Sequence, residues 1–321
     1  MGLRDDLVKY LNYMFDTRSF HPKADGPSIS DHALEAARSI RGVTRAPALM
    51  LHGVMPRSGT VYVGELLRLH PDLAAYPNEI WELPFLKQAG EIRKLQKEFF
   101  FSYEQNIGKI GDGDFLPLFG SALIAYLHSF LPPEQRMLVK VPGVQYLTDF
   151  FAVFPAENLL LLVRDGRDVV HSTLRTWPQL RFSMVCRRWR RAAEMILSFD
   201  SIHSGRQGYW LARYEDAVQD PAAFVQEACM RFGLEVNRFP FEEIDTVAVH
   251  GSSSLKVEGK VVWDHVDRPK DFRPCLLYTS DAADDLLCVD LGCRRIIKKK
   301  NNQNTTYERL YTEFQSLHTC C

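Results

Sequence analysis

The sequence lacks several features that would direct it to a membrane, a secretory route or nucleic acid. No apolar run approaches the roughly 20 residues needed to span a bilayer. The net charge is −1, so no global basic field points to nucleic acid. The first ten residues carry four charged side chains, which is unlike the apolar core of a secretory signal. These absences predict a cytoplasmic protein that neither spans a membrane nor binds nucleic acid.

The sequence also lacks a cysteine framework in its main body. Of seven cysteines, only Cys186 and Cys229 precede residue 270. Neither has a Cys-x-x-Cys partner or a nearby histidine at the spacing of a metal site. Both are therefore expected to be buried thiols, and no metal site is predicted.

A Walker lysine is missing from a region that otherwise has the order of a phosphate-binding loop. The apolar run from Ala48 to Leu51 predicts a buried strand, and a tight loop from Gly53 to Gly59 follows it. Apolar residues then recur at helical spacing, namely Val63, Leu66, Leu67 and Leu69. The start of such a helix offers unpaired backbone N–H groups and a dipole that favours anions.

Three side chains add hydrogen-bond donors to this loop: Arg57, Ser58 and Thr60. The Walker pattern is G-x-x-x-x-G-K-[ST], whereas here the two glycines stand one residue too far apart and Thr60 occupies the lysine position. The loop therefore favours a phosphate bound without metal over a nucleoside triphosphate with magnesium. The alternative is an ordinary strand, turn and helix with an exposed arginine.

Apolar strands alternate with helices along the chain. Strands are predicted at residues 48–51, 136–142, 158–163 and 209–213, and helices at 3–16, 31–40, 85–105, 115–130, 144–154, from 168, 181–201 and 220–232. This alternation predicts an α/β protein whose central parallel sheet is covered on both faces. Ligands bind outside the carboxyl ends of such strands. Arg57, Lys140 and Arg164 all lie at these ends.

A second set of polar residues follows the predicted strand 158–163. Arg164 ends the strand, and Ser172 lies eight residues later on the returning helix. Together they are candidates to hold a second phosphate, with Asp165 or Asp168 as the helix cap. The alternative is a capped helix with surface charges.

Three motifs in this order resemble the sulfotransferase family: Pro56-Arg-Ser-Gly-Thr60, Arg164 through Ser172, and Ala212-Arg-Tyr-Glu-Asp216 followed by Asp220-Pro221. The resemblance covers residues 45–274. It implies a three-layer sandwich with a central parallel sheet, the P-loop NTPase-like sulfotransferase fold. It also implies 3′-phosphoadenosine 5′-phosphosulfate (PAPS) as the donor, leaving as adenosine 3′,5′-bisphosphate (PAP), with no metal.

The resemblance assigns a cofactor-binding role to ten residues. The 5′-phosphosulfate would be held by Arg57, Ser58, Gly59, Thr60 and Val61, the 3′-phosphate by Arg164 and Ser172, and Tyr214 would lie near the adenine. Lys256 and Lys260 are candidates for a basic loop that closes over the 3′-phosphate. Lys140 resembles a lysine in a Lys-x-Pro segment and would stabilise charge on the transferring group.

The general base must take a proton from the acceptor. Some family members use a histidine in a Lys-Thr-His segment, but the matching stretch here, Lys140-Val-Pro142, has none. Others use a glutamate shortly after the loop helix, and Glu79 stands in that place, with Glu82 as the alternative. The predicted catalytic set is therefore Glu79, Lys140 and Arg57. The alternative is that Glu79 caps the following helix.

The domain prediction is a single sulfotransferase domain at residues 1–274. Residues 275–321 resemble translated sequencing-adapter sequence, and their composition shifts abruptly to Cys, Asp, Lys and Asn, so a non-native or disordered tail is predicted. The predicted reaction moves a sulfuryl group to a hydroxyl or amine of a small-molecule or glycan acceptor. The alternatives are a P-loop kinase-like phosphotransferase and a non-catalytic nucleotide-binding module, and a homodimer stays open.

Overall fold

The structure is a computed structural model that describes residues 27–42, 45–75, 77, 80 and 82–247, and the backbone of residues 251–257 and 260–266. Three predictions lie outside these residues: the helix at 3–16, the base Glu79, and the tail at 275–321. Lys256 and Lys260 are described by their backbone alone.

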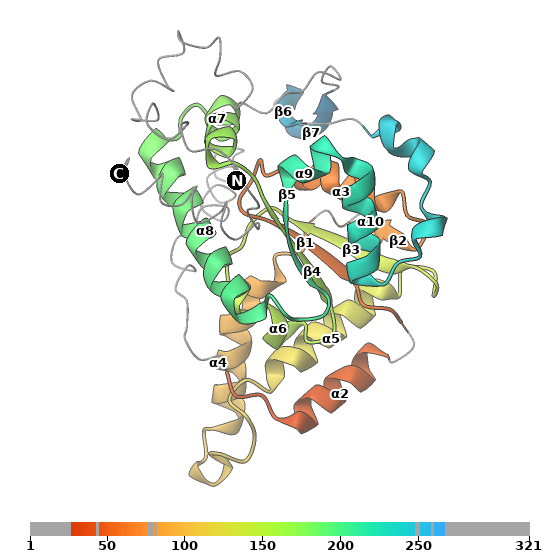
Figure 1. Ribbon diagram of the computed structural model, residues 1–321. Coiled ribbons are helices and arrows are strands. Elements are labelled where there is room, and N and C mark those ends of the chain that lie inside the picture. Colours follow the sequence, from red (N-terminus) through yellow and green to blue (C-terminus); the bar gives the residue numbers. More distant parts are fainter. Residues whose placement is uncertain are drawn as a thin grey trace.

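A five-stranded parallel sheet forms the centre of the fold (Figure 1). Its strands are β1 (Leu49–Gly53), β2 (Leu73–Ala75), β3 (Arg136–Val141), β4 (Asn158–Val163) and β5 (Tyr209–Arg213), in the order β2-β3-β1-β4-β5. Every residue of β1, β3 and β4 is buried, and most residues of these strands are apolar. The four predicted strands are confirmed. The sequence prediction missed β2, which is a three-residue edge strand.

Helices cover both faces of the sheet and complete three layers (Figure 1). The α-helices are α2 (Asp31–Arg41), α3 (Thr60–Arg68), α4 (Ala89–Phe100), α5 (Phe115–His128), α6 (Phe150–Val153), α7 (Gly166–Thr176), α8 (Phe182–His203), α9 (Tyr214–Gln219) and α10 (Pro221–Phe232). One core packs Met50, Val139 and Leu161 against α5, α6 and α8. The other packs Leu51 and Leu160 against α3 and α10. The predicted three-layer α/β fold is confirmed.

Two predicted helices are shorter in the structure than in the sequence prediction. The helix expected at 85–105 begins as the 3-10 helix η2 (Phe85–Gln88), continues as α4 and ends at Phe100. The helix expected at 144–154 is reduced to η4 (Leu147–Asp149) and α6. Tyr146 has a left-handed φ of 59°, so the regular helical path starts only after it.

A β-hairpin lies late in the chain. The chain also has three short 3-10 helices besides η2 and η4. Strands β6 (Gly251–Val257) and β7 (Lys260–Val266) pair antiparallel, with Lys256 opposite Val261 and Val257 opposite Lys260. The 3-10 helices are η3 (Glu104–Asn106), η5 (Val236–Arg238) and η6 (Phe241–Thr246). Within the described ranges, every helix is too short or too polar to cross a bilayer.

Candidate active site

The loop between β1 and α3 is closed by its own hydrogen bonds. The Val54 N–H donates to the Leu162 carbonyl at 2.9 Å, which continues the pairing of β1 with β4. The Met55 N–H donates to Ser58 Oγ at 3.1 Å, and the Ser58 N–H donates to the Met55 carbonyl at 3.2 Å. The Ser58 hydroxyl is therefore already engaged in shaping the loop, and the residue is only 1% exposed.

Two residues of the loop have a left-handed backbone. Arg57 has φ 78° and Gly59 has φ 88°. A left-handed arginine is uncommon, and such positions concentrate at functional sites. Gly59 is the N-cap of α3, and no side chain of the described residues caps this helix. The first N–H groups of α3, at Thr60 and Val61, are thus placed to meet an anion.

The Gly59→Ala variant should be strongly destabilised. A Cβ at this position would overlap ring atoms of Tyr214, and the positive φ adds its own cost. We expect roughly 1–2 kcal/mol from the backbone and about 1–3 kcal/mol from overpacking, measured by urea unfolding. Gly42→Ala is the matched control, since Gly42 has φ 84° and open space around its Cβ position. Equal losses in the two variants would contradict the close contact with Tyr214.

Arg164 joins the end of β4 to this loop. Its Nη1 donates to the Arg57 carbonyl at 3.1 Å, and its Nη2 lies 3.4 Å from Asp168 Oδ2. The Arg164 carbonyl accepts a hydrogen bond from Trp189 Nε1 at 3.3 Å. Arg164 is therefore held both at its backbone carbonyl and at its guanidinium, which contacts the loop backbone.

Arg57 and Ser172 also meet. Arg57 Nε donates to Ser172 Oγ at 3.0 Å, which connects the loop to the helix α7. The structure thus brings together Arg57, Arg164 and Ser172, which the sequence assigned to two separate anion sites. Asp165, and not Asp168, caps α7: its carboxylate accepts the Arg167 N–H at 2.8 Å.

The Arg-Tyr-Glu-Asp segment packs against these two motifs. Glu215 Oε1 accepts the Asp165 N–H at 2.9 Å, and Arg213 lies 3.6 Å from the same carboxylate. Burial raises the pKa of Glu215, which these two contacts partly offset. Tyr214 is 2% exposed and lies under Gly59. The segment therefore packs against the loop at Gly59.

Lys140 lies one register position before the end of β3. It is 7% exposed, pairs in register with Leu51 of β1, and shares an isolated parallel bridge with Glu82. Burial lowers the pKa of Lys140, while the charges of Glu82 and Glu65 raise it. Burial likewise raises the pKa of Glu82, opposed by the charge of Lys140. Each group therefore favours the charged form of the other.

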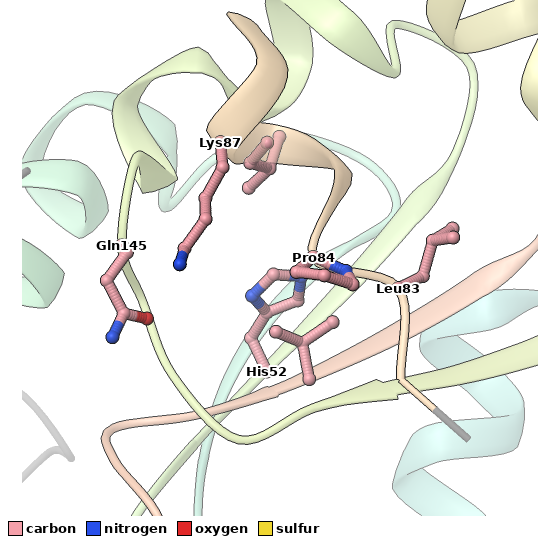
Figure 2. Close-up of a pocket in the computed structure, with 7 residues that line it drawn as sticks. His52, Leu83, Pro84, Lys87 and Gln145 are labelled. Atoms are coloured by element: carbon pink, nitrogen blue, oxygen red, sulfur yellow. The ribbon is translucent and has the colours of Figure 1, made fainter. Parts of the chain in front are cut away.

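A small pocket lies beside His52 at the carboxyl ends of β1 and β3. It is lined by His52, Leu83, Pro84, Leu86, Lys87, Val141 and Gln145. Figure 2 shows the Lys87 ammonium and the Gln145 amide on the same side of the His52 ring. The Nδ1 of His52 lies 2.9 Å from the Gly143 carbonyl, so it carries the proton when the ring is neutral. Burial lowers the pKa of His52 to about 4.

Stability should fall on acidification because of His52. Its pKa is lower in the folded state, about 4 against 6.5, so the unfolded chain binds the proton first. The contribution is complete above pH 6.5 and is lost as the pH falls toward 4. Between pH 7.5 and 5 we expect a loss of about 2 kcal/mol in the free energy of unfolding. The His52→Gln variant should remove that share, and an unchanged pH slope would refute this assignment.

The sequence prediction missed the His52 pocket and the buried place of Tyr214. His52 is a lone histidine in an apolar strand. Its pocket partners come from residues 83–87 and 145, so no local pattern signals them. Among the described residues, no three His, Cys, Asp or Glu side chains cluster as a metal site.

The chain is similar to several known proteins. A curated relative, protein-tyrosine sulfotransferase A of Caenorhabditis elegans, is 25% identical over 232 residues, or 67% of this chain and 56% of that protein. The chain thus spans little more than half the length of that relative. Two solved structures are also similar. The sulfotransferase domain of the Synechococcus PCC 7002 olefin synthase is 19% identical, with 64% and 78% of the two chains covered and a TM-score of 0.43. The sulfotransferase domain of the curacin biosynthetic pathway is 16% identical, with 85% and 99% covered and a TM-score of 0.44.

The family assignment rests on a match to a family model. The model of the sulfotransferase family matches residues 52–238, more than half of the chain. This span holds the loop with Arg57, the end of β3 with Lys140, and the residues Arg164, Ser172 and Tyr214. The resemblance predicted from the three motifs is confirmed, and the chain belongs to the sulfotransferase family.

Proposed function

We propose that the chain transfers a sulfuryl group from PAPS to a hydroxyl or amine acceptor. The observation that supports this most is the junction of Ser172, Arg57 and Arg164, with the Ser172–Arg57 and Arg164–Arg57 distances at 3.0 and 3.1 Å. The junction joins α7 to the loop that we propose binds an anion. A ligand with phosphates at two ends of one ribose fits such a pair of sites.

The residues present suit this donor. The backbone N–H groups from Arg57 to Val61 would hold the 5′-phosphosulfate, and Arg164 with Ser172 would hold the 3′-phosphate. Lys256 and Lys260 stay predicted contacts to the 3′-phosphate. When bound, PAPS supplies the sulfuryl group and a phosphate leaving group.

Lys140 is proposed to meet the negative charge that develops on the transferring group. It is a nearly buried cation fixed by β3, and such a charge is effective because it needs little reorganisation. Glu82 lies beside it and favours its protonated form. Glu82 is thus first a partner of Lys140, and Glu79 is kept as the proposed base on the resemblance.

The acceptor hydroxyl most worth testing is a phenol. The curated relative is named for protein tyrosine, whose phenolic oxygen is a hydroxyl acceptor. Small molecules, glycans and amines remain the wider acceptor class. The cytoplasmic location and the homodimer stay predictions as well.

The proposal is tested by transfer of radiolabelled sulfate. The full chain is incubated with [35S]PAPS and separate panels of tyrosine peptides, simple phenols, glycans and amines. Label should pass to at least one panel and PAP should form in equal amount. Binding of PAP without transfer to any panel would favour the non-catalytic nucleotide-binding module. Phosphate transfer from ATP with magnesium would favour the kinase-like alternative.

A further inference from the structure

We propose that the pocket beside His52 binds a carboxylate carried by the acceptor, and that Lys87 is the residue that gives the protein its preference for such acceptors. The inference rests on the proposed function, because it names a chemical class for the acceptor of that reaction. Its basis is the position of the pocket, the charge of its lining, its size and the contacts that hold its walls.

The pocket lies next to the residues proposed to act in the transfer. Val141 lines the pocket and directly follows Lys140 in β3. Leu83 also lines it and directly follows Glu82, which shares a parallel bridge with Lys140. Consecutive Cα atoms are about 3.8 Å apart, so the pocket is one residue from this pair on both segments. An acceptor at the carboxyl ends of the strands can therefore contact both places.

The lining of the pocket is complementary to a negative charge. Lys87 supplies an ammonium group and Gln145 an amide, and Figure 2 shows both on the same side of the His52 ring. None of the described residues that line the pocket is acidic. Burial lowers the pKa of His52 to about 4, so the ring is neutral at pH 7 and the lysine sets the charge. The ammonium and the amide N–H groups are donors, and a carboxylate accepts hydrogen bonds from both.

The pocket is small, and its polar groups can be reached from solvent. The cavity volume is about 10 Å³, which is room for roughly one water-sized group. His52 is 4% exposed, whereas Lys87 and Gln145 are half-buried and Pro84 is exposed. One carboxylate oxygen therefore fits inside the pocket, while the rest of the acceptor stays outside it.

The walls of the pocket are held in place by neighbouring contacts. The His52 ring meets the Phe150 ring edge-on, with the centroids 5.7 Å apart. Arg93 of α4 donates two hydrogen bonds to Asp149 of η4, at 2.9 and 2.8 Å. These two elements follow closely the segments that carry the ammonium and the amide, so the two sides of the pocket are tied together. Fixed walls reduce the entropy lost when a ligand binds.

The first experiment compares acceptors that differ in charge at one group. In the class of acceptor that takes label from [35S]PAPS, the free acid is compared with its methyl ester; among phenols these are 4-hydroxyphenylacetate and methyl 4-hydroxyphenylacetate. The acid should have a kcat/KM at least about tenfold higher, mainly through a lower KM, because hydrogen bonds to charged groups are the stronger ones. An acid that is no better than its ester would overturn the proposal.

Reversing the charge of Lys87 should reverse this preference. Lys87→Glu should favour N,N-dimethyltyramine, a cationic phenol, over 4-hydroxyphenylacetate, and should keep PAP affinity within about threefold of the wild type. Lys97→Glu makes the same charge change at an exposed position of α4 and should keep the wild-type preference. An unchanged preference in Lys87→Glu, or an equal shift in both variants, would overturn the proposal.

A binding measurement separates this proposal from the proposed function. Phenylacetate has no hydroxyl to accept a sulfuryl group, so its binding does not depend on transfer. In NMR titrations of the wild-type full chain it should shift the side-chain amide signals of Gln145, and phenylacetamide should shift them less. Absence of these shifts would overturn the proposal even where transfer occurs. Shifts without PAP binding or transfer would reject the proposed function and leave the pocket as a carboxylate site.

Discussion

The Arg164→Ala variant should bind PAP at least 100-fold more weakly than the wild type. The substitution removes the proposed charge-assisted contact to the 3′-phosphate and the observed hydrogen bond to the Arg57 carbonyl, which belongs to the loop. Contacts from charged groups contribute roughly 1.5–3 kcal/mol each, and two of them account for a loss of this size. Isothermal titration with PAP measures the effect.

Arg167→Ala is the matched control for Arg164. It removes the same charge from the same motif, but its side chain is 44% exposed and pairs with Asp165 at the start of α7. We expect PAP affinity within about threefold of the wild type, in line with the small worth of exposed pairs. Arg164→Lys should lie between, since lysine lacks the planar fork of donors. An Arg164→Ala variant that binds like Arg167→Ala would remove Arg164 from the site.

The Glu79→Gln variant should keep PAP binding and lose turnover. A general base contributes a factor of roughly 10²–10⁴ to the rate, so kcat should fall by that amount while PAP affinity stays within threefold. Single-turnover transfer from [35S]PAPS to the best acceptor measures it. Retained turnover would place the base elsewhere.

Glu82→Gln is the paired variant and should change the pH profile. Burial lowers the pKa of Lys140, and the charge of Glu82 raises it, so removing that charge lowers it further. In its proposed role Lys140 acts when protonated, and the alkaline limb of kcat should therefore move to lower pH. A large loss of kcat at all pH values in Glu82→Gln, with Glu79→Gln active, would make Glu82 the base.

The sequence predicts those parts of the fold that depend on local pattern. The runs 136–142 and 158–163 are mainly apolar because both sheet faces are covered, and they form β3 and β4 as expected. The edge strand β2 was not predicted because Leu73–Ala75 is too short to show a periodic pattern of apolar residues. The predicted helix at 144–154 was too long because a left-handed Tyr146 cannot be read from residue type.

The candidate site is predictable where the residue types of a motif indicate what they bind. Arg57, Arg164 and Ser172 come from two motifs 107 and more residues apart, and the parallel sheet explains why they meet. The environment of Tyr214 has no such signal. Its motif gives the residue type, while its burial depends on Gly59 and Tyr62, which belong to another element. Contacts across the sheet edge therefore need the three-dimensional structure.

The most direct test of a metal-free PAPS site is isothermal titration of the full chain with PAP in the presence of EDTA. We predict one-to-one binding of PAP that EDTA leaves unchanged. We also predict no competition from ATP with magnesium at equal concentration. Absence of PAP binding, or binding of ATP that requires magnesium and displaces PAP, would contradict these predictions.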